Sequence, residues 1–232
     1  MANKRTEKTE FHKDERRKQI LKTAASIFAQ KGYHQTAVKD ITDSAGISVG
    51  TFYLYFKNKE DLFEKLYDEI WRYLSNLSDY AHEKDNCASP NMFARVIAST
   101  LWGYQKFKDL TKILMIEAVG LNPSFEEKYA EIMRKSVSDI ESNFEPKKER
   151  GLIYAPDIKV AATAYIGAIN NVITCWLRDN THTDLCDSSY PLVIFLMQAI
   201  NLEFSALEIK QSIDEILEEL ESKPELLDVF NH

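Results

Sequence analysis

Apolar residues recur at helical spacing along most of this sequence, and helix breakers rarely interrupt them. The 232 residues include only seven glycines and six prolines, and no stretch alternates convincingly between apolar and polar residues as a half-buried strand does. A composition of 44% hydrophobic and 28% charged residues is typical of a folded chain. The sequence therefore predicts an all-α protein, long enough for a small domain joined to a larger one.

Several protein classes are disfavoured at this stage. The longest apolar candidate for a membrane helix, residues 191–200, is about half the length required, and the first residues lack the apolar core of a secretory signal. Three cysteines, Cys87, Cys175 and Cys186, form no CxxC pair, which argues against a disulfide framework or a zinc ribbon. We expect a cytoplasmic protein with reduced thiols.

Signatures of catalysis and of metal binding are also missing from the sequence. It contains no GxSxG, P-loop, HExxH or dinucleotide fingerprint. Residues 182–187 include His, Asp and Cys, but they lack the spacing of an established metal site. We therefore predict that the protein is not an enzyme and has neither a cofactor nor a metal.

Charge is distributed unevenly along the chain. The formal net charge is −7, which by itself disfavours a nucleic-acid partner. Residues 1–60, however, hold twelve Lys and Arg against seven Asp and Glu, whereas the remaining residues hold 17 against 29. One basic end and one acidic body indicate that only the N-terminal part meets phosphate, although an excess of this size also occurs by chance in a solvated tail.

Three short helices are predicted near the N-terminus. The spacing of apolar residues predicts an amphipathic helix over residues 15–31 that ends at Gly32. A second helix of under three turns follows, with Thr36 as its expected N-cap and Gly46 just after its end. Ser48 is expected to cap the third. Two short helices joined by a tight turn form the helix-turn-helix plan, in which the last helix enters the major groove of DNA.

The third helix has an unusual outer face. Phe52 and Phe56 are four residues apart and share the inward face, so Tyr53 and Leu54 point outward. An exposed leucine beside an exposed tyrosine is unfavourable in water, but in a major groove Leu54 can contact thymine methyl groups. Gly50 costs roughly 1 kcal/mol against alanine within a helix, and its missing side chain would let the backbone approach DNA closely.

Lysines flank the recognition helix. Lys57 and Lys59 follow it, and Lys39 lies on the exposed side of the preceding helix. Lys59 is expected at the positive end of a long fourth helix, where a bound phosphate would balance both charges. Asn58 is a good start signal for that helix, which runs to about His82.

The run GYHQTAVKDITDSAGISVGTFYLYFKNKEDLF, residues 32–63, and the preceding ILKTAASIFAQ resemble the DNA-binding domain of the TetR/AcrR repressors over about fifty residues. The Gly-Tyr, Ala-Gly-Ile-Ser, Gly-Thr-Phe-Tyr and Lys-Asn-Lys groups fall at the family spacing. The resemblance implies a homodimer on a palindromic operator, with release of the DNA when a small molecule binds the larger C-terminal domain. The recognition helix has no arginine, so the common Arg-to-guanine contact is missing there.

Carried over by position, the resemblance implies the following DNA-contacting residues: Thr36, Lys39, Ser48, Val49, Gly50, Thr51, Tyr53, Leu54, Tyr55 and Lys59. The corresponding domains are a helix-turn-helix domain over residues 13–60 with its motif at 37–56, a helical ligand-binding and dimerisation domain over 61–208, and an extra acidic amphipathic helix and tail over 209–232. We expect the tail to pack on the bundle rather than to bind DNA.

The body is described by pattern alone. Helices over about residues 157–179 and 191–207 carry apolar surfaces too wide for burial on one side. By analogy with the family, they are expected to pair with their copies in a four-helix dimer interface. The alternative is that both helices are buried within one subunit.

A pocket for a small, largely apolar effector is expected among the remaining helices, with aromatic and methionine walls and a few polar groups. For each residue taken singly, ordinary core packing is the competing interpretation. The candidates are Trp102, Tyr104, Phe107, Met115, Glu117, Phe125, Tyr129, Met133, Asn170 and Trp176.

Two functions remain open from the sequence. The first is a repressor that a small molecule releases from its operator. The second is an effector-independent, architectural dimer that binds DNA and uses its acidic body only for association. Stabilisation by a pocket ligand would distinguish the two, because a ligand that binds the folded state raises its melting temperature.

Overall fold

The computed structural model describes residues 2–83, 89–118, 120, 123–178, 184–223 and 229, and within these ranges it contains helices and no strand. The all-α prediction is therefore confirmed. The chain divides into two compact units. The first contains residues 1–72, 109–117 and 228–232, and the second contains residues 73–108 and 118–227.

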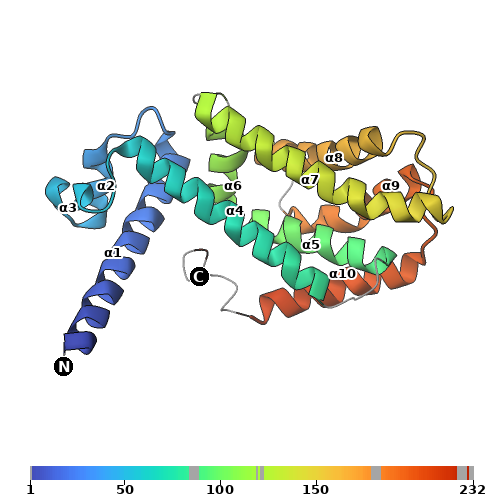
Figure 1. Ribbon diagram of the computed structural model, residues 1–232, viewed down its shortest axis with the longest axis horizontal. Coiled ribbons are helices and arrows are strands. Elements are labelled where there is room, and N and C mark those ends of the chain that lie inside the picture. The colour runs from blue at the N-terminus through green and yellow to red at the C-terminus, as the bar shows by residue number, and fades with distance from the viewer. Residues whose placement is uncertain are drawn as a thin grey trace. The chain divides into compact units, whose positions relative to one another are not determined.

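Three complete helices and the start of a fourth form most of the first unit (Figure 1). These are α1 (Ala2–Lys31), α2 (Val38–Ala45), α3 (Val49–Tyr53) and α4 (Lys59–Glu83), the last of which continues into the second unit. The helix α1 starts thirteen residues before the predicted position, because the added residues include no glycine or proline to stop it. The third helix is also shorter than predicted, since it ends at Tyr53.

Aromatic rings form the core of the first unit. Phe28 on α1 packs edge to face against Phe63 on α4, with ring centroids 5.3 Å apart. Tyr33, which follows α1, also packs edge to face against Phe63, with ring centroids 4.8 Å apart. Offset and edge-to-face pairs of this kind add to the stabilisation from burial alone. They fix α1 and α4 as the frame on which the two short helices are held.

A segment from the middle of the chain completes the first unit. It includes most of α6 (Lys108–Lys112) and the π-helix η1 (Ile113–Glu117). Ile113 and Leu114 are fully buried. Lys112 Nζ donates to the carbonyl of Ala29, 2.7 Å away, near the C-terminal end of α1. The expected boundary at residue 60 thus differs from the observed units, because burial recruits this distant segment to the N-terminal one.

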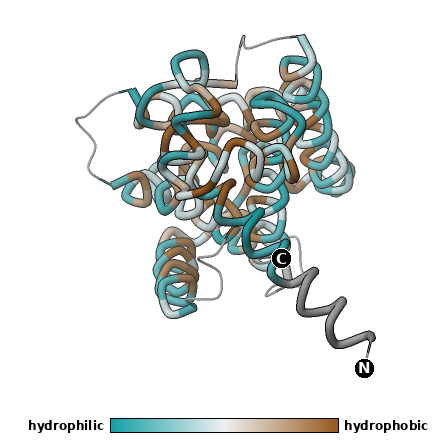
Figure 2. Tube along the Cα trace, turned by 90° about the vertical axis from the view of Figure 1, so that its left-hand side faces the viewer, coloured by the Kyte–Doolittle hydropathy of each residue, from teal (hydrophilic) through white to brown (hydrophobic). Residues whose placement is uncertain are grey.

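The second unit is a helical bundle built around α5. Figure 2 shows helices with hydrophobic residues on one side of their turns and hydrophilic residues on the other. Both α9 and α10 pack against α5, and α7 packs against α8. The complete helices of this unit are α5 (Pro90–Lys106), α7 (Pro123–Glu149), α8 (Ile158–Arg178), the 3-10 turn η2 (Cys186–Ser188), α9 (Ser189–Ala199) and α10 (Ala206–Glu221).

The last helix, α10, is held to α5 by polar as well as apolar contacts. Trp102 Nε1 donates to Glu221 at 2.9 Å, and Lys106 forms an ion pair with the same carboxylate at 2.7 Å. The side chains of Ile209 and Ile216, also on α10, are fully buried. The prediction that the C-terminal extra helix packs on the bundle is confirmed.

One predicted helix is wrong in extent. Residues 191–207 were expected to be continuous, but α9 ends at Ala199 and α10 begins only at Ala206. Asn201 adopts a left-handed conformation with φ of 52°, which a helix does not tolerate. Ser205 then caps α10 by accepting from the backbone N–H of Glu208 at 3.4 Å.

A lysine is buried in the second unit beside aromatic rings. Lys147 on α7 is 6% exposed; its Nζ donates to Asn143 Oδ1 at 2.7 Å and lies 5.1 Å from the ring centre of Phe93. Phe144, one turn earlier, packs edge to face against Tyr165 of α8 at 5.5 Å. Burial lowers the pKa of the Lys147 ammonium group, because a low-dielectric environment disfavours the charged form.

Candidate DNA-binding surface

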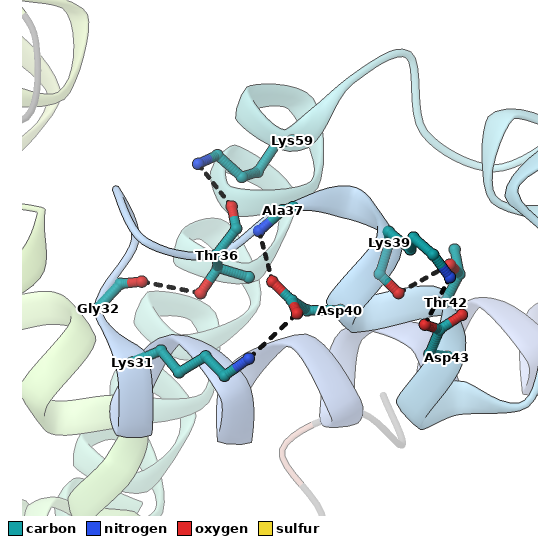
Figure 3. Close-up of polar contacts among 9 residues, drawn as sticks. All are labelled: Lys31, Gly32, Thr36, Ala37, Lys39, Asp40, Thr42, Asp43 and Lys59. Carbon is teal, nitrogen blue, oxygen red and sulfur yellow. Dashed lines mark hydrogen bonds and ion pairs between the residues drawn. The ribbon is translucent and has the colours of Figure 1, made fainter.

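The start of α2 is fixed by a carboxylate rather than by the predicted threonine. Asp40 Oδ2 accepts from the backbone N–H of Ala37 at 2.8 Å, and its Oδ1 accepts from Lys31 Nζ of α1 at 3.0 Å (Figure 3). These two hydrogen bonds, the backbone one first, lower the pKa of Asp40. The first turn of α2 is thereby tied to the end of α1.

Thr36 was predicted both as the N-cap of α2 and as a DNA contact; the structure corrects the first and turns the side chain away from solvent. Ala37 occupies the N-cap position. The side chain of Thr36 is turned inward: the residue is 2% exposed, and its hydroxyl donates to the carbonyl of Gly32 at 2.8 Å (Figure 3). A buried hydroxyl with its own acceptor stabilises the loop and is not presented to a ligand.

The turn between α2 and α3 has the predicted glycine and serine signals. Gly46 has φ of 64° and donates to the carbonyls of Asp43 and Thr42, which is the left-handed C-cap that favours glycine. Ser48 Oγ then accepts from the backbone N–H of Thr51 at 3.0 Å. Both helix boundaries follow from local chemistry, so the angle of α3 is set by short-range contacts.

The recognition helix α3 and the turn directly after it have a buried side and an open side, as predicted. Phe52 and Phe56 are buried, with ring centroids 5.6 Å apart. Tyr53 is 54% exposed and Leu54 is 75% exposed. Gly50 is also exposed, and a Cβ built there would meet only Ser48 Oγ, at 3.7 Å. Intramolecular packing therefore does not require glycine at this position.

The start of α4 is capped as predicted. Asn58 Oδ1 accepts from the backbone N–H of Asp61 at 2.7 Å, and Asp61 Oδ2 accepts from the backbone N–H of Lys57 at 2.9 Å. This reciprocal pair satisfies free donors at the N-terminus of the helix. It also places Lys57 directly after the turn that follows α3.

Lys59 has a structural role that its sequence position did not indicate. Its Nζ donates to the carbonyls of Tyr33 and Thr36, both at 2.8 Å, and lies 4.2 Å from the ring centre of Tyr33. Figure 3 shows the side chain reaching back to the loop before α2. Burial lowers its pKa. Two of its three N–H donors are thus used within the protein, and one is left for a phosphate.

Lys39 is less constrained. Its Nζ forms an ion pair with Asp43 at 2.8 Å, and both side chains are largely exposed. Hydrogen bonding to Asp43, followed by the charge of that carboxylate, raises the pKa of Lys39. An exposed pair of this kind contributes little to stability, so Lys39 exchanges this partner for another anion at small cost.

A groove beside the recognition helix was not predicted from the sequence. Lys13, Asp14 and Arg17 of α1 and Leu54 and Tyr55 after α3 line an open groove of about 470 Å³. The signal was present in the sequence, since Lys13 and Arg17 are four residues apart and share one face of α1. It was overlooked because the contact with the end of α3 is tertiary.

The predicted pocket residues are only partly brought together. Asn170 Nδ2 of α8 donates to Met133 Sδ of α7 at 3.2 Å, so these two meet as expected. Trp102 instead donates to Glu221. Met115 belongs to the first unit, which corrects its assignment to a pocket in the body, because η1 packs with α1.

The other predicted pocket residues have varied surroundings. Phe107 packs edge to face against Tyr73 at 4.9 Å, and the ring of Trp176 lies 4.8 Å from Lys108 Nζ. Tyr104 and Phe125 are buried. Burial raises the pKa of Tyr129. The side chain of Glu117 lies outside the described residues, as do Cys87 and His182.

Two helices of the second unit leave apolar side chains uncovered. On α8, Tyr165 and Ile173 are buried, whereas Val160 on another face is 65% exposed. On α9, Phe195 is 60% exposed while Leu196 is buried. The expectation that both helices carry apolar surface on more than one side is thus confirmed for the subunit by itself.

The helix α8 is also long and apolar enough to cross a membrane by length and composition. Its most apolar 18-residue window has a mean hydropathy of 1.4, and 22% of that window is buried. Asn170 and Asn171 interrupt the apolar residues of this window, so a search for an uninterrupted apolar run does not identify it. Core helices of soluble proteins pass the same test, so the match is weak evidence for a membrane span.

Comparison with known proteins identifies relatives of most of the chain and of its N-terminal part. Residues 20–66 match the family model of the bacterial regulatory proteins, tetR family. The fatty acid metabolism regulator protein of Bacillus subtilis is 27% identical over 185 residues, which are 79% of this chain and 94% of that protein. The HTH-type transcriptional repressor KstR2 of Mycolicibacterium smegmatis is 39% identical over 75 residues, covering 32% of this chain and 36% of that protein.

A solved structure shows the same fold. The transcriptional regulator FadR from Bacillus subtilis, crystallised in complex with stearoyl-CoA, has a TM-score of 0.68 and 27% sequence identity. The similarity covers 78% of this chain and 98% of that one. About a fifth of the present chain therefore has no counterpart there.

Proposed function

Since the chain belongs to the TetR family of bacterial transcriptional regulators, we propose that it is a repressor that binds a palindromic operator as a homodimer. An acyl-CoA bound in the second unit releases it from the DNA. The observation that carries the DNA-binding proposal is the recognition helix, where Phe52 and Phe56 are buried while Tyr53 and Leu54 are exposed. A face of this kind suits base edges and thymine methyl groups.

The proposed DNA-binding residues lie on α2, in the turn before α3, on α3, directly after it and at the start of α4. Gly50 leaves room for the backbone to approach the DNA, and Tyr53 reaches a phosphate or a base edge. Lys39 contributes a cation from α2. The full proposed set is Lys39, Ser48, Val49, Gly50, Thr51, Tyr53, Leu54, Tyr55 and Lys59, with the last limited to one remaining N–H donor.

DNase I footprinting upstream of the protein's own gene and its neighbours tests the operator. We expect a protected site with two-fold symmetry, because a symmetric dimer reads two half-sites. Tyr53→Ala should weaken binding to that site with little change in the melting temperature, since Tyr53 is 54% exposed and only one face of its environment, the edge-to-face contact with Phe52, is internal. Uniform protection without a preferred site would contradict the proposal of an operator.

The dimer proposal rests on the uncovered apolar residues of α8 and α9. Val160 and Phe195 are more than half exposed in the single subunit, and surface of this kind marks an interaction site. Pairing of the two helices with their copies would bury it in a symmetric interface. Sedimentation equilibrium should give a dimer at micromolar concentration, and Phe195→Asp should shift it to a monomer. A monomeric wild type would contradict the proposal.

The effector proposal rests on the relative crystallised with stearoyl-CoA and on the apolar side chains of the second unit. Stearoyl-CoA should raise the melting temperature, by an amount equivalent to about 2.7 kcal/mol at a ligand concentration 100 times the Kd. It should also release the operator in a fluorescence anisotropy assay. Coenzyme A alone and stearate alone are the matched controls.

These controls separate recognition of the whole acyl-CoA from recognition of either half. Release by stearate would indicate a fatty-acid effector instead. Intact operator binding with no response to any acyl-CoA or fatty acid would support the effector-independent architectural function. As a DNA-binding regulator, the protein is proposed to act in the cytoplasm.

A further inference from the structure

The groove next to the recognition helix joins two elements of the first unit. Lys13, Asp14 and Arg17 come from α1, and Leu54 and Tyr55 follow α3. Leu54 thus takes part in two surfaces, since it is also the most exposed large hydrophobic residue of the recognition segment. Whatever occupies the groove lies directly beside the DNA-reading face.

This part of α1 lies outside the residues that match the family model. The family match begins at residue 20, whereas α1 begins at Ala2. Figure 1 shows the N-terminal half of α1 continuing as a rod past α2 and α3. The groove is therefore built by residues before the family match together with residues inside it, and the residues carried over from the family do not include Lys13 or Arg17.

The charges of the groove favour an anion. Lys13 is exposed, and its ammonium group has no ion-pair partner among the residues that the structure describes. Arg17 Nη1 lies 3.3 Å from Glu69 Oε1, but Arg72 also pairs with Glu69 and shares that carboxylate. An arginine has five N–H donors, so Arg17 keeps donors for a second partner. Asp14 opposes the two cations, and the lining carries a net positive charge.

The two lysines that the family resemblance implies as DNA contacts are less available. Lys59 uses two donors on backbone carbonyls, and Lys39 is paired with Asp43. Among the described cations near α3, Lys13 and Lys57 have the freest ammonium groups. A phosphate clamp beside the recognition helix therefore has its best donors on α1 and directly after α3, and not at the start of α4.

We propose that the groove binds a phosphate group of the DNA backbone, with Lys13 and Arg17 as its donors, while α3 reads the neighbouring base edges. The proposal rests on the proposed function and adds a second contact element to it. Phosphate contacts of this kind position a protein on the duplex and carry no sequence information. Each one releases counterions, which makes its presence measurable through salt dependence.

The test measures the Kd for duplex DNA by fluorescence anisotropy over a series of salt concentrations. Lys13→Gln should reduce the slope of log K against log salt by about one and weaken binding about tenfold at low salt. Lys22→Gln is the matched control. It removes the same charge from the same helix, but nine residues away, which is about 180° around α1, and its slope should equal that of the wild type.

Two further variants keep the test independent of folding. Lys13→Arg keeps the charge and should restore the wild-type slope, and Lys13→Glu should reduce the slope further. Melting temperatures of all four variants should equal that of the wild type, because Lys13 and Lys22 are exposed. A slope for Lys13→Gln equal to that of the wild type, or equal losses for Lys13→Gln and Lys22→Gln, would overturn the proposal.

The same series on a random duplex separates this proposal from the proposed function. Phosphate contacts do not depend on sequence, so the effect of Lys13→Gln should appear on random DNA as well. A lower slope without any preferred promoter site would retain the groove and reject the operator. A preferred site with an unchanged slope would retain the operator and reject the groove.

Discussion

The two units of this protein differ in how their contacts are distributed along the sequence. In the N-terminal unit, the boundaries of α2, α3 and α4 are fixed by hydrogen bonds between residues at most five positions apart, such as Asn58 with Asp61. In the second unit, the characteristic polar contacts join residues more than a hundred positions apart, such as Trp102 with Glu221. Hydrogen bonds between residues close in the chain can be recognised in the sequence as a motif. Contacts between distant residues cannot, and only the apolar pattern of each helix is visible there.

Similarity to relatives follows the same division. The N-terminal part matches KstR2 of Mycolicibacterium smegmatis at 39% identity over 75 residues. Over most of the chain, identity to the Bacillus subtilis regulator falls to 27%. A surface that reads DNA restricts both side chains and their geometry, while a bundle accepts many apolar sequences of suitable volume.

The largest expected effect is the loss of stability when one buried ring is removed from either unit. Phe52→Ala removes a fully buried ring from the first unit and should cost about 3–5 kcal/mol, with loss of operator binding. Phe144→Ala removes an equally buried ring from the second unit and should cost a similar amount. Chemical denaturation followed by circular dichroism measures both.

The two phenylalanine variants should differ in association. Sedimentation of Phe52→Ala should still give a dimer, because the proposed interface lies on α8 and α9 of the other unit. Dissociation of Phe52→Ala into monomers would show that the two units do not keep their structures separately.

Lys59→Met tests the internal role of the Lys59 ammonium group. The change leaves the carbonyls of Tyr33 and Thr36 without a donor, which should lower the free energy of unfolding by about 1–3 kcal/mol. The salt slope of operator binding should change less than it does in Lys13→Gln. If Lys59→Met instead lowered the slope of log K against log salt by one and left the free energy of unfolding unchanged, Lys59 would be a phosphate contact.

Leu54→Asn and Leu152→Asn compare how much an exposed leucine of each unit contributes to DNA affinity. Operator affinity should fall about tenfold, equivalent to about 1.4 kcal/mol, because contact with thymine methyl groups is lost. Leu152→Asn, at a position that is also exposed, should leave affinity unchanged. Gel-shift titration measures both. Equal affinities for Leu54→Asn and the wild type would remove Leu54 from the recognition surface.

Lys147→Met should have the smallest effect, a gain of roughly 1 kcal/mol in stability at neutral pH, because it removes a buried cation. The lowered pKa of Lys147 gives the effect a pH dependence. Between that lowered pKa and the ordinary lysine value, the unfolded chain binds a proton that the folded chain does not, so wild-type stability rises with pH. The advantage of Lys147→Met should therefore shrink between pH 7 and pH 10, as thermal unfolding at both values will measure.

The sequence determined the fold class, the helix-turn-helix, and the inward and outward faces of α3. Each depends on periodicity or on a signal within one turn, as Gly46, Ser48 and Asn58 show. It also identified α8 and α9 as helices with excess apolar surface. The sequence predicted the N-cap of α2 at Thr36, one residue too early. The N-cap is the adjacent Ala37, because Asp40 in the first turn of α2 accepts a hydrogen bond from the backbone N–H of Ala37.

Tertiary structure alone decided the rest. Residues 109–117 pack in the N-terminal unit, α9 ends at Ala199, and Lys59 donates to two backbone carbonyls. The tertiary structure also brings Lys13 and Arg17 to the end of α3. Each of these joins residues far apart in the chain or depends on the direction of a long side chain. Periodicity shows which face of a helix is apolar, but it carries no information on which element will cover that face.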